Sequence, residues 1–85
     1  MIGMKVRAQG RAATADEVTA EEMVFDFGDA FQVQGAAVQV QTAAGVIKAF
    51  VGSVTFTAER VTVTNPGSGV AFAATDRVVV IASGV

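Results

Sequence analysis

The chain has 85 residues, a net charge of −2 and a sequence pI of about 4.8, so it fits one domain and offers no basic surface for nucleic acid. It contains no cysteine and no histidine, which excludes disulfides, thiol chemistry and the usual zinc ligand sets. Its apolar residues are small, with sixteen valines and sixteen alanines against six phenylalanines and no leucine, and such a thin core predicts stabilisation by oligomerisation.

Alternation of apolar and polar residues predicts β-strands along most of the chain, in which valine, isoleucine and threonine make up 27 residues. A first strand is expected at KVRAQGR, residues 5–11. The one helical candidate is TADEVTAEEM, residues 14–23, because Thr14 and Glu17 have the spacing of a capping box.

A second strand is expected in MVFDFGDAFQVQ, residues 23–34, with a bulge or turn at Gly28-Asp29. The alternation then changes phase at Gly35-Ala36-Ala37, since apolar residues are odd-numbered before these positions and even-numbered after them. One extra residue in the register is produced by a hairpin turn or by a β-bulge. The hairpin is the favoured interpretation and a bulged single strand is the alternative.

The remaining strands are expected at residues 46–57, 59–64, 70–74 and 77–82. A type II turn is predicted at NPGSG, where Pro66 presets φ and Gly67 supplies a positive φ, and a second turn is predicted at Thr75-Asp76. The unbroken apolar run after Arg77 predicts a strand covered on both faces. The fold class is therefore all-β: one domain over residues 1–85, a small β-barrel or β-sandwich of about seven short antiparallel strands, with at most one short helix near residues 14–23.

Residues for catalysis are scarce. Without histidine, cysteine, tyrosine or tryptophan the chain lacks the usual acyl-transfer triads, metal-water sites and aromatic platforms for bases or sugars. Six of the eight acidic residues fall between Asp16 and Asp29, but their spacing matches no EF-hand loop, so a solvated acidic face is favoured over calcium. We expect no enzymatic activity, no cofactor, no metal and no small-molecule substrate.

No segment has the length of a membrane span or the apolar stretch of a signal peptide. A protein made in the cytoplasm, with no membrane or nucleic-acid partner, is expected.

The segment FQVQGAAVQVQT, residues 31–42, carries glutamine where a solvated strand usually carries charge. A neutral amide costs far less to remove from water than an ammonium or a carboxylate, and charge is depleted at the centres of protein interfaces. The pattern favours burial against another chain over simple solvation. Arg77, alone before an apolar strand, needs a carboxylate partner. The interface candidates are therefore Gln32, Gln34, Gln39, Gln41 and Arg77.

The stretch VTFTAERVTVTNPGSGVAFAATDRVVVIASG, residues 54–84, resembles the cysteine-free, Val/Thr/Ala/Gly-rich chains of small tailed-bacteriophage virion proteins. Within that group the resemblance is greatest to capsid decoration (cement) proteins, and it covers about residues 30–85 in composition and strand rhythm. It implies a homo-oligomer on the outer capsid that stabilises contacts between major capsid subunits, located in the virion. The acidic segment 14–29 matches no pattern of that group.

Two alternatives of other classes remain open. A neck, tail or fibre component of a virion has the same composition and strand rhythm. A stand-alone module that binds a host protein or glycan is the other, although a glycan site normally uses tryptophan or tyrosine, and this chain has neither.

Overall fold

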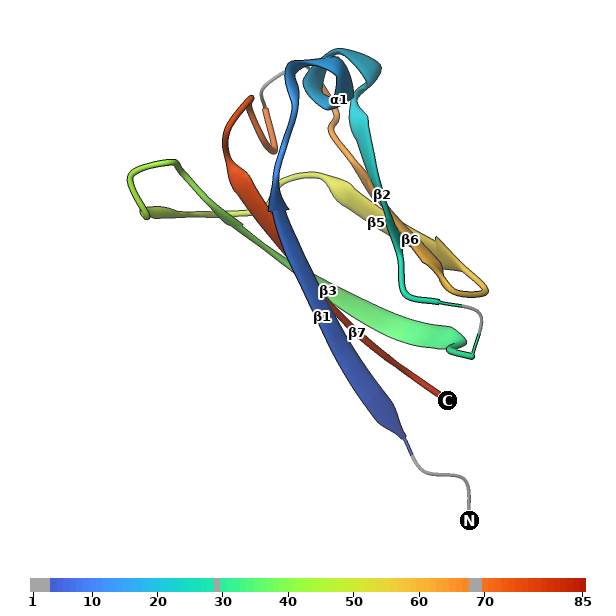
Figure 1. Ribbon diagram of the computed structural model, residues 1–85. Helices are drawn as coiled ribbons and strands as arrows, with labels where there is room; N and C mark the ends of the chain where they lie inside the picture. The colour runs from blue at the N-terminus through green and yellow to red at the C-terminus, as the bar shows by residue number, and fades with distance from the viewer. Residues whose placement is uncertain (1–3, 29, 68–69) are drawn as a thin grey trace.

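The computed structural model describes residues 4–28, 30–67 and 70–85 and forms a β-sandwich with one short helix (Figure 1). In chain order its elements are β1 (Lys5–Ala12), α1 (Ala15–Ala20), β2 (Glu22–Asp26), β3 (Val33–Gln41), β4 (Ile47–Lys48), β5 (Ser53–Thr57), β6 (Arg60–Thr64) and β7 (Arg77–Gly84). The prediction of an all-β fold with about seven antiparallel strands and one short helix is confirmed.

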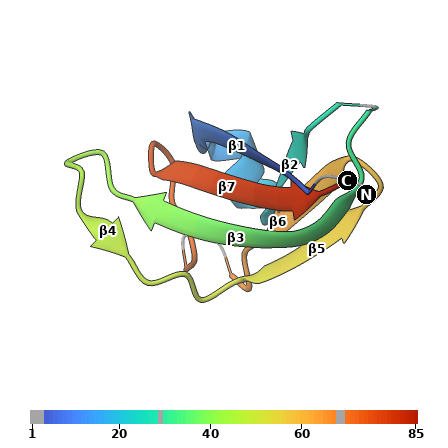
Figure 2. The same ribbon diagram turned by 90° about the horizontal axis from the view of Figure 1, so that it is seen from below.

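The strands form two antiparallel sheets (Figures 1 and 2). The four-stranded sheet has the order β1-β7-β3-β4, so β7 lies in its centre between β1 and β3. The three-stranded sheet has the order β2-β6-β5. The strands β3 and β7 are neighbours although β4, β5 and β6 lie between them in the chain, so the sheet depends on long-range pairing.

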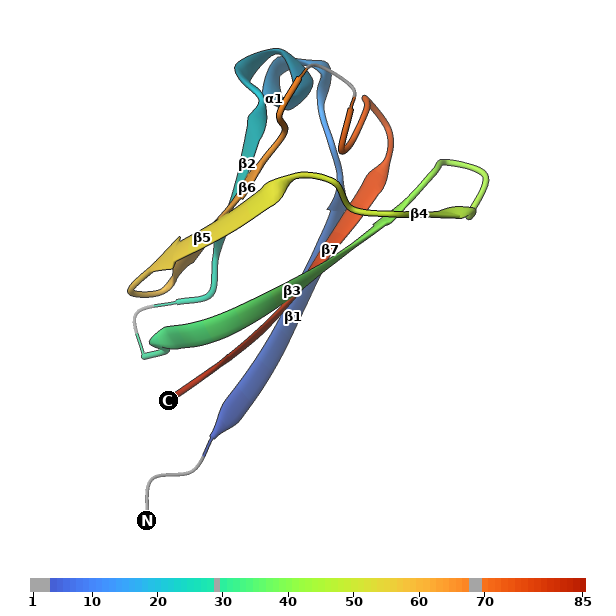
Figure 3. The ribbon, with the colours of Figure 1, turned by 180° about the vertical axis from the view of Figure 1, so that it is seen from behind.

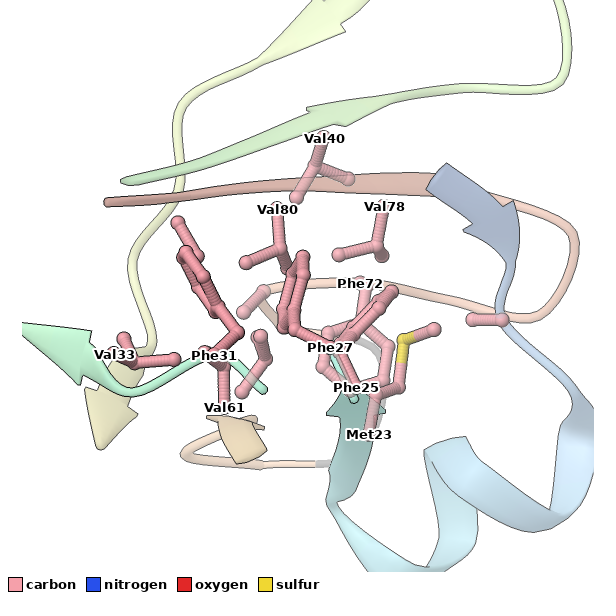
Figure 4. Packing of buried hydrophobic residues seen from close by; sticks show 14 residues of the cluster. Met23, Phe25, Phe27, Phe31, Val33, Val40, Val61, Phe72, Val78 and Val80 are labelled. Atoms are coloured by element: carbon pink, nitrogen blue, oxygen red, sulfur yellow. The ribbon is translucent and has the colours of Figure 1, made fainter. Parts of the chain in front are cut away.

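The core lies between the two sheets and is built from valines and four buried phenylalanines (Figure 4). Alternate residues of β2, β6 and β7 point into it, as period-two alternation requires. Two of the phenylalanines, Phe27 and Phe31, lie in the connection from β2 to β3, with ring centroids 6.0 Å apart. The buried apolar residues are Ala13, Met23, Phe25, Phe27, Phe31, Val33, Val40, Val61, Val63, Ala71, Phe72, Val78, Val80 and Ala82.

The phase change in the glutamine-rich segment is a β-bulge. The favoured hairpin is wrong: residues 33–41 form the single strand β3, and its register against β7 shifts between Val33 and Gly35. After the shift Val40 points into the core while Gln39 and Gln41 point away from it. Pairing with the distant β7 selects the bulge over the hairpin, because the backbone of β7 forms hydrogen bonds along the whole length of β3.

The strand predicted at residues 46–57 is interrupted. Its first part forms β4 in the four-stranded sheet, and the chain then crosses to the other sheet to form β5. Gly52 lies in this crossing, where a Cβ atom would come 2.2 Å from the Thr64 carbonyl oxygen. Only glycine allows the two backbones to approach so closely.

The segment between β6 and β7 differs from its prediction in two ways. Gly67 does not adopt a positive φ, so the predicted type II turn does not form, and two residues of the turn sequence lie outside the described residues. Residues 70–74 form no strand. Instead the buried Asn65 side chain donates to the Phe72 carbonyl at 2.9 Å and accepts from the Ala71 N–H at 2.8 Å. The Asn65 side-chain amide thus satisfies two backbone groups of this loop that would otherwise need a neighbouring strand as their partner.

The helix α1 begins where its sequence predicts. Thr14 is the N-cap, and its hydroxyl accepts from the Glu17 N–H at 3.2 Å while the Glu17 carboxylate accepts from the Thr14 N–H at 3.1 Å. This reciprocal pair is a complete capping box. The helix ends at Glu21, which adopts the left-handed conformation with φ 63°, so it is shorter than the predicted candidate and β2 starts directly after it.

Candidate interaction surfaces

The polar side chains of β1 lie on the inner side of the four-stranded sheet. Arg7 Nη1 donates to the Phe27 carbonyl at 2.6 Å, and Gln9 Nε2 donates to the Asp26 carbonyl at 2.6 Å. Arg11 continues the row by donating to the Val24 carbonyl at 3.2 Å. These side chains close one side of the sandwich, because they satisfy backbone carbonyls at the edge strand β2 that no other strand reaches.

The arginines of this row also cover the aromatic core. The Arg7 guanidinium lies 4.9 Å from the Phe31 ring centroid, and that of Arg11 lies 4.9 Å from the Phe25 ring. Arg11 also pairs with Glu17 at 2.6 Å, and this hydrogen bond lowers the pKa of the Glu17 carboxyl below its usual value. The alternating residues of β1, which are small and apolar, consequently point to the outside of the molecule.

The opposite side of the four-stranded sheet forms a surface that we call the outer face. Cross-strand partners point to the same side of a sheet, so the register defines its rows. Only small, apolar or amide side chains occupy it, apart from one serine and one arginine. From one end to the other its rows are Val6–Ser83–Gly35, Ala8–Ile81–Ala37, Gly10–Val79–Gln39 and Ala12–Arg77–Gln41, with Ile47 of β4 beside Gln41.

The central strand β7 has apolar side chains on both of its sides, but only one side is covered. Val78, Val80 and Ala82 are fully buried in the core. On the outer face, Ile81 is 46% exposed although it belongs to the middle strand of the sheet. The unbroken apolar run predicts that both faces of β7 are covered, but within the single chain only the face toward the core is covered.

The structure places the predicted interface residues in two groups. Gln39, Gln41 and Arg77 lie together on the outer face, in its two last rows. Gln32 and Gln34 are exposed at the other end of β3, where Gln34 is the extra residue of the bulge. The Gln32 backbone exchanges two hydrogen bonds with Val85, at 2.9 and 3.1 Å.

Among the described residues that form the rows of the outer face, Arg77 is the only charged one. Its guanidinium extends along the sheet toward β1, so that a Cβ atom built on Gly10 would lie 3.0 Å from Nη2. Within residues 4–28, 30–67 and 70–85, the Arg77 side chain forms no ion pair or hydrogen bond. The carboxylate partner that the sequence predicts is therefore not supplied by the described part of this chain.

The hairpin between β3 and β4 projects from the sandwich, and we call residues 41–48 the arm (Figures 2 and 3). The arm carries no charge before Lys48 at its base. Its tip, residues 43–45, is exposed, and Val46 and Ile47 are each 62% exposed. An apolar projection of this kind is a candidate contact with another protein.

An ion pair fixes the base of the arm to the body. Lys48 Nζ lies 2.8 Å from the Asp76 carboxylate, which also accepts from the Ala73 N–H at 2.9 Å. Burial alone raises the pKa of Asp76, but the hydrogen bonds from Lys48 and Ala73 outweigh it and hold the pKa below its usual value. The charged form of Asp76 is thus the form that the fold stabilises.

This ion pair predicts how stability depends on pH. Because the pKa of Asp76 is lower in the folded than in the unfolded chain, its contribution is complete above about pH 4 and is lost as the pH falls through the folded value. Urea unfolding at neutral and acidic pH should show a smaller loss of stability on acidification for Asp76→Asn than for the wild type. Glu22→Gln, an exposed carboxylate, is the control and should leave the pH dependence unchanged. Equal pH profiles for Asp76→Asn and the wild type would contradict this role.

The described residues contain no pocket and no cluster of acidic or metal-ligating side chains that would hold a metal ion. The acidic residues that the sequence groups together are divided in the structure, with Glu17 at the start of α1 and Asp26 at the end of β2, where it lies 3.5 Å from Arg60. Asp29 lies outside the described residues. No helix in this part of the chain has the length and apolar character needed to span a bilayer.

Comparisons with protein-family models, with curated proteins and with solved structures find no match to this chain, so its function has to be inferred from its own residues and surfaces.

Proposed function

We propose that the chain is a non-enzymatic structural protein of a bacteriophage virion, a decoration protein that binds the outer capsid and stabilises contacts between major capsid subunits. The observation that carries this proposal is the arm, a hairpin that projects from the sandwich, carries no charge before Lys48 and exposes Val46 and Ile47. The composition and strand rhythm shared with small virion proteins support the same assignment.

The arm is suited to docking on a protein surface. Removing apolar surface from water contributes about 25 cal/mol per Å², and Val46 and Ile47 present most of their side chains to solvent. The ion pair between Lys48 and Asp76 holds the base of the arm in place before any partner binds. A fixed arm loses less conformational entropy on binding than a flexible loop does, so more of its apolar contact energy remains as affinity.

A decoration protein acts through linkage. A ligand that binds only the assembled shell stabilises that shell over its separated subunits. Each copy offers a small contact, but many copies on one particle add their contributions, and copies joined to one another gain further from multivalency. This role requires no catalytic site.

Co-sedimentation with capsids that lack the protein tests the proposal. Val46→Lys places a charge on the arm and should weaken binding at least about tenfold, because burying an unpaired charge is costly. Val70→Lys is the matched control, since Val70 is a similarly exposed valine (53% against 62%) outside the arm. It should bind like the wild type.

Two results would contradict the proposal. If the wild-type chain does not sediment with capsids but does sediment with isolated tails or host cells, it belongs to one of the alternative classes. If Val46→Lys binds capsids as tightly as Val70→Lys, the arm is not the docking element.

A further inference from the structure

We propose that residues 73–76 form a strained turn that the arm holds closed through the ion pair between Lys48 and Asp76. When Lys48 is drawn away from Asp76, the turn opens, and the adjoining end of the β1–β7 ladder loosens with it. The arm and this end of the ladder are therefore coupled. The inference is independent of the proposed function, because it concerns the isolated chain in solution.

The turn places a threonine where glycine is usual. The Asp76 N–H donates to the Ala73 carbonyl at 3.0 Å, which closes a four-residue turn. Thr75, the third residue of this turn, has a φ of 72°. A positive φ at the third position is typical of a type II turn, in which glycine or asparagine normally occupies that position. Threonine is β-branched and its side chain disfavours this left-handed conformation, so the turn is strained at Thr75.

The Thr75 side chain does not offset this strain by a contact of its own. It is exposed, and within residues 4–28, 30–67 and 70–85 its hydroxyl forms no hydrogen bond. The other described non-glycine residues with a positive φ are Glu21, at the end of a helix, and Ala58, in a hairpin loop, and neither is β-branched. A strained backbone persists only where the surrounding structure holds it in place. Groups around Thr75 therefore hold the turn.

Two sets of contacts do so. Ala13, which is buried directly after β1, exchanges two backbone hydrogen bonds with the turn: the Thr75 N–H donates to the Ala13 carbonyl at 2.9 Å, and the Ala13 N–H donates to the Asp76 carbonyl at 2.8 Å. The second set is formed by the Asp76 side chain, whose Oδ2 accepts from the Ala73 N–H at 2.9 Å and from Lys48 Nζ at 2.8 Å. A single carboxylate oxygen thus joins the turn to the arm.

Loss of the Lys48 contact and the strain at Thr75 act in the same direction. Asp76 is only 6% exposed, and a buried carboxylate without its cation is costly, so Asp76 has to reach water once Lys48 is gone. The turn has to open for this, and opening also releases Thr75 from its left-handed conformation. The Ala13 hydrogen bonds adjoin the last residue pair of the β1–β7 ladder, so an open turn loosens that end of the sheet.

Native-state hydrogen exchange, followed by NMR on the isolated chain, tests this coupling. Lys48→Met removes the ammonium but keeps a long unbranched side chain, and it should speed exchange of the Ala73 and Asp76 N–H groups at least about tenfold. The Ala13 N–H should become faster with them, because it donates to the same turn. Val46→Lys, which changes the arm but leaves the ion pair intact, is the matched control and should not alter exchange at the turn. It also separates this inference from the proposed function, since it should weaken capsid binding alone.

Thr75→Gly tests the strain by itself. Glycine adopts a positive φ without steric cost, so this variant should slow exchange of the Asp76 N–H about fivefold, both in the wild type and together with Lys48→Met. Thr55→Gly, at an exposed threonine of β5, is the control and should leave exchange at the turn unchanged. Wild-type exchange at the turn in Lys48→Met would overturn the proposal, and so would exchange in Thr75→Gly that is as fast as in the wild type or faster.

Discussion

Replacing Asn65 with alanine is expected to lower the free energy of unfolding by about 3 kcal/mol, since it removes hydrogen bonds from two buried backbone groups. The Asn65 side chain donates to the Phe72 carbonyl and accepts from the Ala71 N–H, and all three residues are fully or almost fully buried. Each buried polar group left without a partner costs about 1–3 kcal/mol. A domain of this size has a total stability of only about 5–15 kcal/mol, so the loss is large.

Urea denaturation measures this effect directly. Gln34→Ala is the control, because Gln34 is exposed and its side chain forms no hydrogen bond within the described residues. Its change should stay within about 0.5 kcal/mol, as is usual for surface substitutions. If Asn65→Ala were no more destabilising than Gln34→Ala, the loop before β7 would not depend on the asparagine, and its burial of Phe72 would need another cause.

Local patterns were sufficient to predict much of this fold. Alternation predicts β1, β2 and β6, because each of these strands has one side in the core and a register that keeps it there. The unbroken apolar run after Arg77 predicts β7. The capping box predicts the start of α1, since Thr14 and Glu17 bind each other's backbone within a single turn. These signals are local, and local interactions decide these elements.

The errors arise where distant residues decide the structure. A bulge and a hairpin produce the same phase change at residues 35–37, and only the edge offered by β7 selects the bulge. The alternation at residues 70–74 resembles a strand, but Asn65 binds the backbone of this segment and no strand pairs with it. Neither partner can be identified from the segment itself.

The candidate surfaces were only partly predictable for a related reason. Alternation in β1 separates Arg7 and Gln9 from Val6 and Ala8, but it does not say which set points inward. Long polar side chains that reach the carbonyls of β2 reverse the usual orientation. The exposed apolar side of β1 could therefore not be found from its sequence, and the interface role of the neutral glutamines next to β7 stays a prediction.

The most direct test of the proposed function is the temperature at which capsids filled with DNA break open. Particles without this protein should assemble normally but open at a lower temperature than complete particles, and adding the purified wild-type chain should restore the difference. Val46→Lys should restore less of it than the wild type does, because the charged side chain weakens the proposed docking contact of the arm. Particles that open at the same temperature with and without the chain, yet fail to attach to cells or eject DNA, would place it in the tail and contradict the proposal.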